Sequence, residues 1–435
     1  MKIINLPIFE PNSLKVTFRY YQFQPKCNNM VWRNASLSFI CIICLLCCQK
    51  TDNRPTISFE IQKMGLNVEL KGIVTDRENQ VEGAEIHWGD DDISYLAKAD
   101  LSTFIKKHQY NLPGTYTITI KLLSLTEIIV TDSIVVDLNY SETSFANIQN
   151  EFLTKKENEL TILTINLHTY QETEQNQKLY MVADVIGKLD VDFVAFQECA
   201  QNRNAPISSG ALRNDNMAIK ITEIINKKYK QKYNMVWDWA HYGWQIYEEG
   251  VCVISKHELL EHEARLVSAA SSKNDITSRK VIFGGYRWKN VQFNIFSAHL
   301  HWRVSAEDEE QNNQIKAVKK MATEKEKSNS NAVTMVCGDF NGNPTSAFPY
   351  SEGYNTMVNN GQYTDTFLEK NPDANTTPPN SKYFTVGGSL PGRIDYIFLK
   401  KNDRIKVKAS QIIFTENVIG TVSDHYGVLT KIEMN

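Results

Sequence analysis

Apolar and polar residues follow two different patterns along the chain. From residue 57 to residue 139, they alternate in short runs such as TISFEIQ, NVELKGIVTD and GTYTITIKLLS. Gly, Asn and Asp residues separate these runs, and none of the runs has the spacing of a helix. Several short strands in one segment of this length are typical of a small β-sandwich.

The pattern changes in residues 158–435, where strand-like runs alternate with helix-like ones. VDFVAFQE, GVCVISK, VQFNIFSAHL and AVTMVCGDF are apolar runs of strand length. NQKLYMVADVIGKLD, MAIKITEIINKKY and EDEEQNNQIKAVKKMATEKEK have the composition and spacing of helices. This segment therefore predicts an α/β (α+β) domain, and the polar residues 140–157 predict a linker between it and the β-sandwich.

The N-terminal residues show neither pattern and predict an export signal. After Met30 and Arg33 comes the apolar stretch ASLSFICIICLLC, and the chain turns polar after LLCC. This stretch is too short to span a bilayer comfortably but has the length of a signal peptide. The segment resembles a bacterial lipoprotein signal, in which Cys48 is the lipidated residue and Cys47 is the alternative.

This resemblance implies how the N-terminus is organised and where the protein resides. We expect translation to start at Met30, residues 1–48 to be a mis-assigned extension plus the signal peptide, and residues 49–56 to be a tether. The alternative is a short membrane anchor that is never cleaved. In both cases the bulk of the chain lies in the cell envelope of a bacterium, held at the membrane by its N-terminus and facing the periplasm or the exterior.

Composition narrows the function only slightly. Hydrophobic residues make up 42% of the chain and charged residues 22%, which is ordinary for a globular protein. The net charge of −3 provides no broad basic field for nucleic acid, although a local basic groove stays compatible with it. Cys199, Cys252 and Cys337 lie far apart within apolar runs, so we expect them to be buried thiols.

Unusual polar residues stand at the ends of apolar runs in the second domain. They are Asn166, Glu198, His299, Asp339 with Asn341, and Asp424 with His425, while Asp395 lies inside the run RIDYIF. Burying a polar group without a partner costs about 1–3 kcal/mol, so one shared site explains the set better than separate structural roles. Open α/β sheets collect their active-site residues at strand ends.

The residue types in this set favour metal-assisted hydrolysis of a phosphate ester. Glu198, with Asn166 nearby, offers hard oxygen ligands that suit Mg²⁺, or Mn²⁺ as the alternative, better than Zn²⁺. Two histidines can flank a phosphate, one as a base and one as a hydrogen-bond donor. The sequence has no HExxH, GxSxG or GxxxxGK[ST] motif, which argues against zinc peptidases, serine hydrolases and P-loop proteins.

In their order along the chain, these motifs resemble the endonuclease/exonuclease/phosphatase superfamily. The order is an Asn in the first strand, then Gln-Glu, a strand-end His, GDFN, RIDY and a terminal SDH. The resemblance implies the DNase I-like fold, a four-layer α/β/β/α sandwich. It also implies that water attacks the phosphorus in line with the leaving group.

The resemblance further implies a role for each residue. Glu198 matches the principal metal ligand, Asn166 supports the metal and the phosphate, and Asp424 matches a second acid near the metal. The catalytic positions follow the same order. Asp339 matches the residue that positions or deprotonates water, Asn341 and His299 match phosphate contacts, and His425, oriented by Asp395, matches the residue that handles proton transfer or charge.

Three further residues are candidates for substrate contact. Arg279 matches a basic residue over the phosphate, with a surface Arg as the alternative, and Trp244 lies in a loop dense in aromatic residues. His168 could touch substrate or have a structural role. His168 and His299 stand where abasic-site endonucleases carry an acid and a Tyr, so both departures point away from abasic-DNA repair.

The first domain carries a separate resemblance. HWGDDD and KHQYNLPGTYTITI resemble the polycystic-kidney-disease (PKD) type of immunoglobulin-like module, which implies a spacer or a binding module. We expect its acidic turn GDDD to be solvated, with a calcium site as the alternative.

Together these patterns predict an exported, monomeric, Mg²⁺-dependent phosphoesterase that acts on a phosphodiester or a phosphomonoester. One alternative is an extracellular DNase I-like nuclease, whose substrate is nucleic acid. The other is a non-catalytic surface binding protein.

Overall fold

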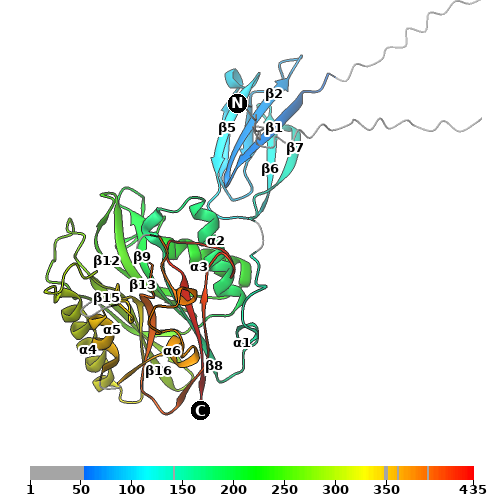
Figure 1. The fold of residues 1–435 in the computed structure, drawn as a ribbon. Coiled ribbons are helices and arrows are strands. Elements are labelled where there is room, and N and C mark those ends of the chain that lie inside the picture. The colour runs from blue at the N-terminus through cyan, green and yellow to red at the C-terminus, as the bar shows by residue number, and fades with distance from the viewer. Residues whose placement is uncertain (1–52, 141–142, 347–350, 360–361, 389–390) are drawn as a thin grey trace, which may run out of the picture. The chain divides into compact units, whose positions relative to one another are not determined.

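The structure is a computed structural model that describes residues 53–140, 143–346, 351–359, 362–388 and 391–435. The chain divides between Asn139 and Tyr140 into two compact units (Figure 1). The predicted lipidation residue Cys48, its alternative Cys47 and the predicted start Met30 lie outside the described residues. None of the described helices combines the length and the apolar character that a membrane span requires.

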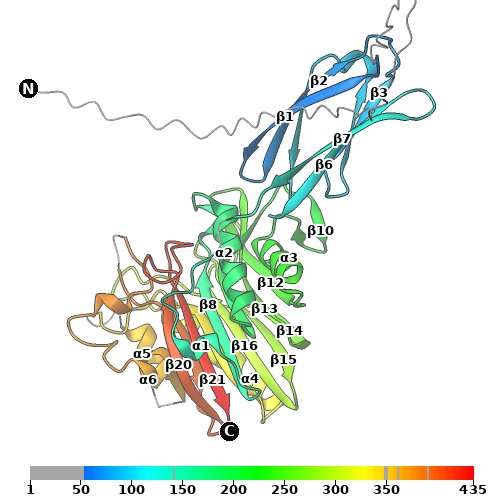
Figure 2. The ribbon, with the colours of Figure 1, turned by 90° about the vertical axis from the view of Figure 1, so that its right-hand side faces the viewer.

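The first unit consists of two antiparallel sheets. One has the order β1 (Thr56–Met64), β2 (Asn67–Thr75), β5 (Phe104–Gln109), and the other the order β4 (Ile93–Ala97), β3 (Gly83–His87), β6 (Thr115–Leu123), β7 (Ile128–Asp137) (Figure 2). A 3₁₀ turn, Lys98–Asp100, follows β4. Alternate side chains of β2 and β6 are buried, which is the period-two pattern of a sheet with one face on a core.

The WGD and HQY segments of this unit meet around one buried tryptophan. Trp88 is fully buried, and the His108 ring stacks on it at a centroid distance of 4.8 Å. The Tyr110 hydroxyl donates a hydrogen bond to the Trp88 carbonyl oxygen at 2.7 Å. Asp90 Oδ2 lies 2.7 Å from His108 Nε2, so this carboxylate of the GDDD turn already has an imidazole partner.

The second unit is built on two six-stranded sheets. The first has the order β12 (Asn234–Gly243), β13 (Tyr247–Ser255), β9 (Phe193–Asn202), β8 (Glu159–Asn166), β21 (Gly427–Met434), β20 (Ile405–Ile413). The second has the order β14 (Glu258–Leu266), β15 (Lys280–Trp288), β16 (Val291–His299), β17 (Val333–Asp339), β19 (Asp395–Lys400), β18 (Tyr363–Asp365). The pairs β8/β9 and β16/β17 are parallel, and all other neighbours are antiparallel.

Helices cover the outer faces of the two sheets (Figures 1 and 2). They are α2 (Gln175–Lys188) and α3 (Met217–Tyr229) on the first sheet, and α4 (Glu310–Ser328) and α5 (Glu352–Val358) on the second. One apolar core fills the space between the sheets, with Ile162 and Phe193 from one meeting Ile282 and Met335 from the other. The layers therefore run α/β/β/α, which confirms the predicted fold class.

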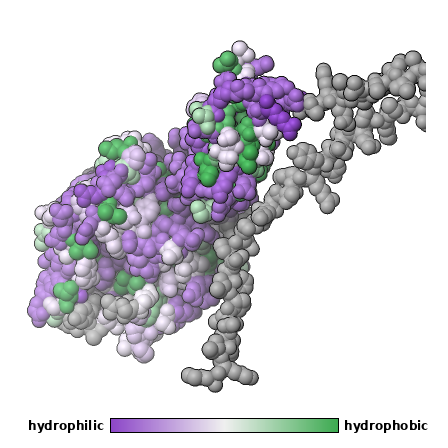
Figure 3. All heavy atoms as spheres, turned by 90° about the horizontal axis from the view of Figure 1, so that it is seen from above, coloured by the Kyte–Doolittle hydropathy of each residue, from purple (hydrophilic) through white to green (hydrophobic). Residues whose placement is uncertain are grey.

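The remaining elements are short. They are α1 (Asn150–Leu153), α6 (Thr366–Lys370), the 3₁₀ turns His168–Tyr170 and Ser381–Tyr383, and the two-stranded ribbon β10 (Ile207–Ser209) and β11 (Leu212–Arg213). The expected linker, residues 140–157, contains α1, and its Ile148 and Phe152 are buried. Cys199, Cys252 and Cys337 are buried free thiols, as the sequence predicted. The face of the molecule seen in Figure 3 is mainly hydrophilic, with separate hydrophobic patches.

Three local expectations are wrong. Glu198 does not end its strand, because β9 continues to Asn202. The aromatic segment predicted as a loop forms strand β12 as far as Gly243, because Trp, Tyr and Val suit a pleated surface and pair along β13. Trp244 itself lies in the turn that follows. Asp424 and His425 do not end a strand but precede the first residue of β21, and Asp395 is the first residue of β19 instead of lying inside it. Both strands run antiparallel to a neighbour, so their beginnings lie beside the neighbour's end.

Candidate active site

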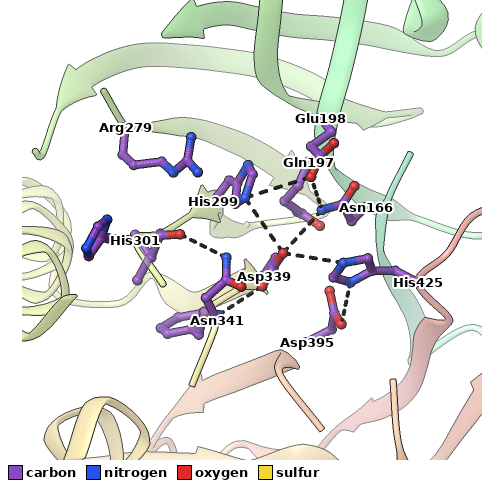
Figure 4. A network of polar contacts seen from close by, with 12 residues as sticks. Asn166, Gln197, Glu198, Arg279, His299, His301, Asp339, Asn341, Asp395 and His425 are labelled. Carbon is purple, nitrogen blue, oxygen red and sulfur yellow. Dashed lines mark hydrogen bonds and ion pairs between the residues drawn. The ribbon is translucent and has the colours of Figure 1, made fainter. Parts of the chain in front are cut away.

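The topology brings the predicted residues to one edge of the sandwich. The parallel pairs place Asn166, the last residue of β8, beside Gln197, which precedes Glu198 within β9. They also place His299 beside Asp339 at the ends of β16 and β17. The antiparallel strand β19 then places Asp395 opposite Asp339. In this way both sheets contribute side chains to the same cleft (Figure 4).

Gly338 lets β17 reach this edge. Its φ is +140°, and a Cβ atom there would lie 2.0 Å from the carbonyl oxygen of Ala298 on the neighbouring strand. A larger residue would therefore push β17 away from β16 directly before Asp339. This explains physically why a Gly precedes the Asp in the GDFN motif.

Asp339 lies at the centre of the site and is buried. Its Oδ2 accepts a hydrogen bond from Asn166 Nδ2 at 3.2 Å, and its Oδ1 accepts one from the Asn341 backbone N–H at 2.9 Å. The Nε2 atoms of His299 and His425 lie 3.7 Å and 3.8 Å from Oδ2. Burial, with a further contribution from Asp395, raises the pKa of Asp339 to about 6.

His425 is held in its charged form. Its Nδ1 donates a hydrogen bond to Asp395 Oδ2 at 3.0 Å, which turns Nε2 toward Asp339. Burial alone would lower the pKa of His425, but the carboxylates of Asp395 and Asp339 raise it well above the usual value. At neutral pH this side chain therefore carries a proton on both ring nitrogens.

His299 has the opposite protonation. Burial, together with the neighbouring Arg279 and His241, holds the pKa of His299 well below its usual value. Its Nδ1 lies 3.8 Å from Glu249 Oε1. Two imidazoles of different charge therefore face the same carboxylate from opposite sides, which is the arrangement by which active sites separate an acid from a base.

Glu198 is turned into the cleft by an irregularity in its strand. The β9–β13 register shifts beside it, between Gly250 and Cys252, and Glu198 itself has φ +45°. Such bulges re-aim side chains at functional sites, and a non-glycine residue accepts this backbone only where its surroundings hold it there. Glu198 Oε1 accepts a hydrogen bond from Asn166 Nδ2 at 2.9 Å.

The donor set around Glu198 fits a divalent cation. Burial and the neighbouring Glu249 raise the pKa of Glu198 to about 8. The two carboxylates lie in one pocket, and the positive groups around them do not offset the cost of burying both as anions. Single ligand atoms of Glu198, Glu249 and His299 lie close enough together to share one ion. Oxygen-rich sites with a net negative charge are the sites that Mg²⁺ and Mn²⁺ occupy in proteins.

Sequence patterns assign no role to three residues of this site, which are Thr169, His241 and Glu249. Glu249 accepts a hydrogen bond from Thr169 Oγ1 at 2.8 Å and lies 3.1 Å from His241 Nε2. Burial alone would raise the pKa of Glu249, but His241 lowers it below the usual value. The β12–β13 pairing places His241 directly opposite Glu249, so recognising β12 as a strand would have pointed to it.

The three weaker candidates lie in or beside the cleft. Arg279 is not a surface residue: it is 3% exposed, and its side chain lines the cleft beside His299. Trp244 also lines the cleft and is 52% exposed. His168 donates from Nδ1 to Glu172 at 2.6 Å and lies 3.4 Å from Asp424 Oδ1.

Asp424 takes part in a second group of potential ligands. Its carboxylate is half exposed and, with His168 and Glu172, forms a cluster separate from the one that contains Glu198. His301, at the other side of the site, pairs with Asp308 at 2.9 Å and stacks on Trp302.

Comparisons with known proteins agree with this geometry. The sequence matches the model of the Endonuclease/Exonuclease/phosphatase family over residues 174–425, which is more than half of the chain and includes His425. An endonuclease/exonuclease/phosphatase family protein from Leptotrichia buccalis C-1013-b is 26% identical, with a TM-score of 0.54, over 63% of this chain and 100% of its own.

A family structure from Beutenbergia cavernae DSM 12333 is 17% identical with a TM-score of 0.48, over 64% of this chain and 72% of its own. Curated proteins gave no match. The family match, the layered fold and the collected polar residues lead to one conclusion. The chain belongs to the endonuclease/exonuclease/phosphatase family and is a metal-dependent hydrolase of phosphoester bonds.

Proposed function

We propose that the protein is an envelope-anchored phosphoesterase that hydrolyses a phosphodiester or a phosphomonoester with Mg²⁺, or with Mn²⁺ in its place. One observation carries the proposal. The Nε2 atoms of His425 and His299 stand 3.8 Å and 3.7 Å from the same buried oxygen of Asp339. Proton donor, proton acceptor and phosphate contacts are thus available within one cleft.

The protonation state of each side chain determines its role in the proposed reaction. Asp339, whose pKa is raised to about 6, aligns the attacking water and takes its proton. His425 donates the proton on Nε2 to the leaving oxygen, while Asp395 holds Nδ1 and the ring orientation. Neutral His299 donates a hydrogen bond to a phosphate oxygen and adds no charge of its own.

Two further residues bind the phosphate. Arg279 brings a guanidinium to the cleft, and its Nε has no hydrogen-bond partner among the described residues. Asn341 is held by a hydrogen bond from its Nδ2 to the Leu300 carbonyl oxygen at 3.0 Å, which positions its amide at the cleft. Glu198 and Glu249 would hold the divalent cation, which neutralises phosphate charge and polarises the P–O bonds.

The N-terminal sequence supports the envelope location. A lipidated Cys48 and the tether of residues 49–56 would attach the enzyme to the membrane, with the PKD-like module as a spacer before the catalytic domain. In a bacterial host, the wild-type protein would sediment with membranes. Cys48→Ala would release it into the soluble fraction; equal membrane association of the two would contradict lipidation at Cys48.

Activity is tested with matched histidine variants of the full chain. His425→Gln removes the proton donor, and His257→Gln is the control because His257 Nε2 also pairs with a buried Asp, Asp192, at 2.9 Å. Asp192 immediately precedes β9, six residues and so roughly 20 Å of extended chain from Glu198. The substrates are bis-p-nitrophenyl phosphate, p-nitrophenylphosphocholine, p-nitrophenyl phosphate and plasmid DNA.

We expect Mg²⁺-dependent turnover of at least one small ester, with loss in EDTA. His425→Gln should lower kcat roughly 10²–10⁴-fold, and the control variant should keep activity. Turnover of DNA alone would favour the nuclease alternative. The absence of all turnover by the folded protein would refute the proposal and favour the binding-protein alternative. The complete set of catalytic side chains argues against that alternative.

A further inference from the structure

The mouth of the active-site cleft is bordered by exposed apolar side chains from three separate loops. Trp244 lies in the turn between β12 and β13, Ile276 precedes β15, and Trp302 follows β16; they are 52%, 56% and 38% exposed. All three line the same cleft as Asp339 and His425. We call Trp244, Ile276 and Trp302 the apolar rim.

The apolar rim adjoins the residue that would bind phosphate. Arg279 donates from Nη1 to the Ile276 carbonyl oxygen at 2.9 Å, and its guanidinium carbon lies 5.3 Å from the centre of the Trp302 ring. The Trp244 ring, which also lines the cleft, lies 6.0 Å from the His168 ring. If Arg279 binds the phosphate of a substrate, the group attached to that phosphate therefore lies close to Ile276 and Trp302.

The size of the cleft limits what can enter it. Its volume is about 180 Å³, which is below the roughly 300–1,000 Å³ of pockets that enclose a whole small ligand. The phosphate and the atoms next to it fit inside, and the rest of the substrate must lie across the mouth. That remainder would meet the apolar rim, which loses water-exposed surface when it is covered.

The charges in the cleft favour a single phosphate. Three carboxylates, Glu198, Glu249 and Asp339, line it, and Arg279 is the one Lys or Arg among its described lining residues. A nucleic acid carries a phosphate at every nucleotide and is normally held along a row of basic side chains. One guanidinium beside an apolar border suits an ester with one phosphate and one apolar group.

We infer that the apolar rim determines specificity by binding an alkyl group of an amphiphilic phosphoester. This inference rests on the proposed phosphoesterase function and names its substrate class. Each methylene group that the rim removes from water should tighten binding roughly fourfold. An ester with a long alkyl chain is then preferred over a short one with the same phosphate group.

The test measures binding without turnover. Dissociation constants of methylphosphonate and heptylphosphonate are determined by calorimetry on the full chain with Mg²⁺. The base-bearing comparison is the methylene phosphonate analogue of thymidine 5′-phosphate, which has no ester bond to hydrolyse. We expect heptylphosphonate to bind at least about tenfold more tightly than methylphosphonate, since two buried methylenes suffice for that gain. The ratio should fall below about threefold in the triple variant Trp244→Ala, Ile276→Ala, Trp302→Ala.

Ile207→Ala is the matched control, because Ile207 is 68% exposed but does not line the cleft. It should keep the wild-type ratio. Equal affinity for the two phosphonates in the wild type, or an unchanged ratio in the triple variant, overturns the inference. Tighter binding of the thymidine phosphonate than of heptylphosphonate overturns the alkyl assignment and favours a stacked base.

The wild-type ratio decides the question even if the triple variant does not fold. Failure of this inference is also distinguishable from failure of the proposed function. A protein that hydrolyses small esters but binds both phosphonates equally retains the function without the specificity. A protein that turns over no ester loses the function, whatever the phosphonate ratio.

Discussion

The substitution Asp395→Asn tests whether a carboxylate keeps His425 protonated for catalysis. Asp395 Oδ2 lies 3.0 Å from His425 Nδ1, and both side chains are buried. Asn has nearly the shape of Asp, and its carbonyl oxygen can still accept the Nδ1 hydrogen bond. The substitution therefore removes the charge while keeping the ring orientation.

The size of the effect follows from the distances. Two unit charges 3.0 Å apart attract by about 5 kcal/mol at an effective dielectric constant of about 20. Asp339, 3.8 Å from Nε2, stays and preserves part of the stabilisation of the imidazolium. We therefore expect the pKa of His425 to fall in the variant, because the nearer of its two carboxylate partners loses its charge.

The assay is kcat/KM of the wild type and the variant from pH 6 to pH 9 on the best ester found. A proton donor works only below its pKa, so a raised pKa keeps wild-type His425 active as the pH rises. The variant should lose less than about tenfold at pH 6 and at least about 100-fold at pH 9.

Asp192→Asn serves as the control, because Asp192 also pairs with a histidine but lies away from the cleft. It should leave the shape of the pH profile unchanged. If Asp395→Asn instead lowered activity by the same factor at every pH, Asp395 would act through structure, and the electrostatic reasoning would be refuted.

Three further outcomes follow from the same geometry. Glu198→Gln should weaken Mn²⁺ binding, measured by calorimetry, at least about tenfold, and an unchanged affinity would remove Glu198 from the metal site. Arg279→Lys should lower kcat/KM roughly 10–100-fold because the planar fork is lost; wild-type kinetics would contradict its phosphate contact. Burial alone would raise the pKa of Asp192, but His257 and Lys155 lower it, so its charge contributes stability above the unfolded pKa of about 4 that is lost as the pH falls through the folded value. Asp192→Asn should therefore lower Tm by several degrees at pH 7 and by less at pH 3, and an equal loss at both would contradict this coupling.

The layers of the fold and most of the candidate site could be predicted from local sequence. The helices at Gln175–Lys188 and Met217–Tyr229 lie within two residues of their apolar periodicity, because that periodicity is what buries one face of a helix. Asn166, Glu198, His299 and Asp339 stood out because each follows an apolar run, where a polar side chain needs a reason.

Other features depended on neighbours that are distant in sequence. The segment of β12 reads as an aromatic loop until β13 pairs with it, and only that pairing sets His241 against Glu249. Arg279 is compatible with a surface position until the strands around it close over its guanidinium. Strand pairing and burial are properties of the whole fold, so local sequence does not contain them.

Local sequence was enough to identify the chemical groups of the site and to show that Asn166, Glu198, His299 and Asp339 follow apolar runs. How those groups differ from one another became visible only in the folded chain. His299 and His425 are the same residue type, yet one is neutral and the other charged. The difference arises because His425 has Asp395 at 3.0 Å, whereas His299 is buried near Arg279 and His241. A protonation state follows from distances to other charges and from exclusion of water, and both exist only once the chain has folded.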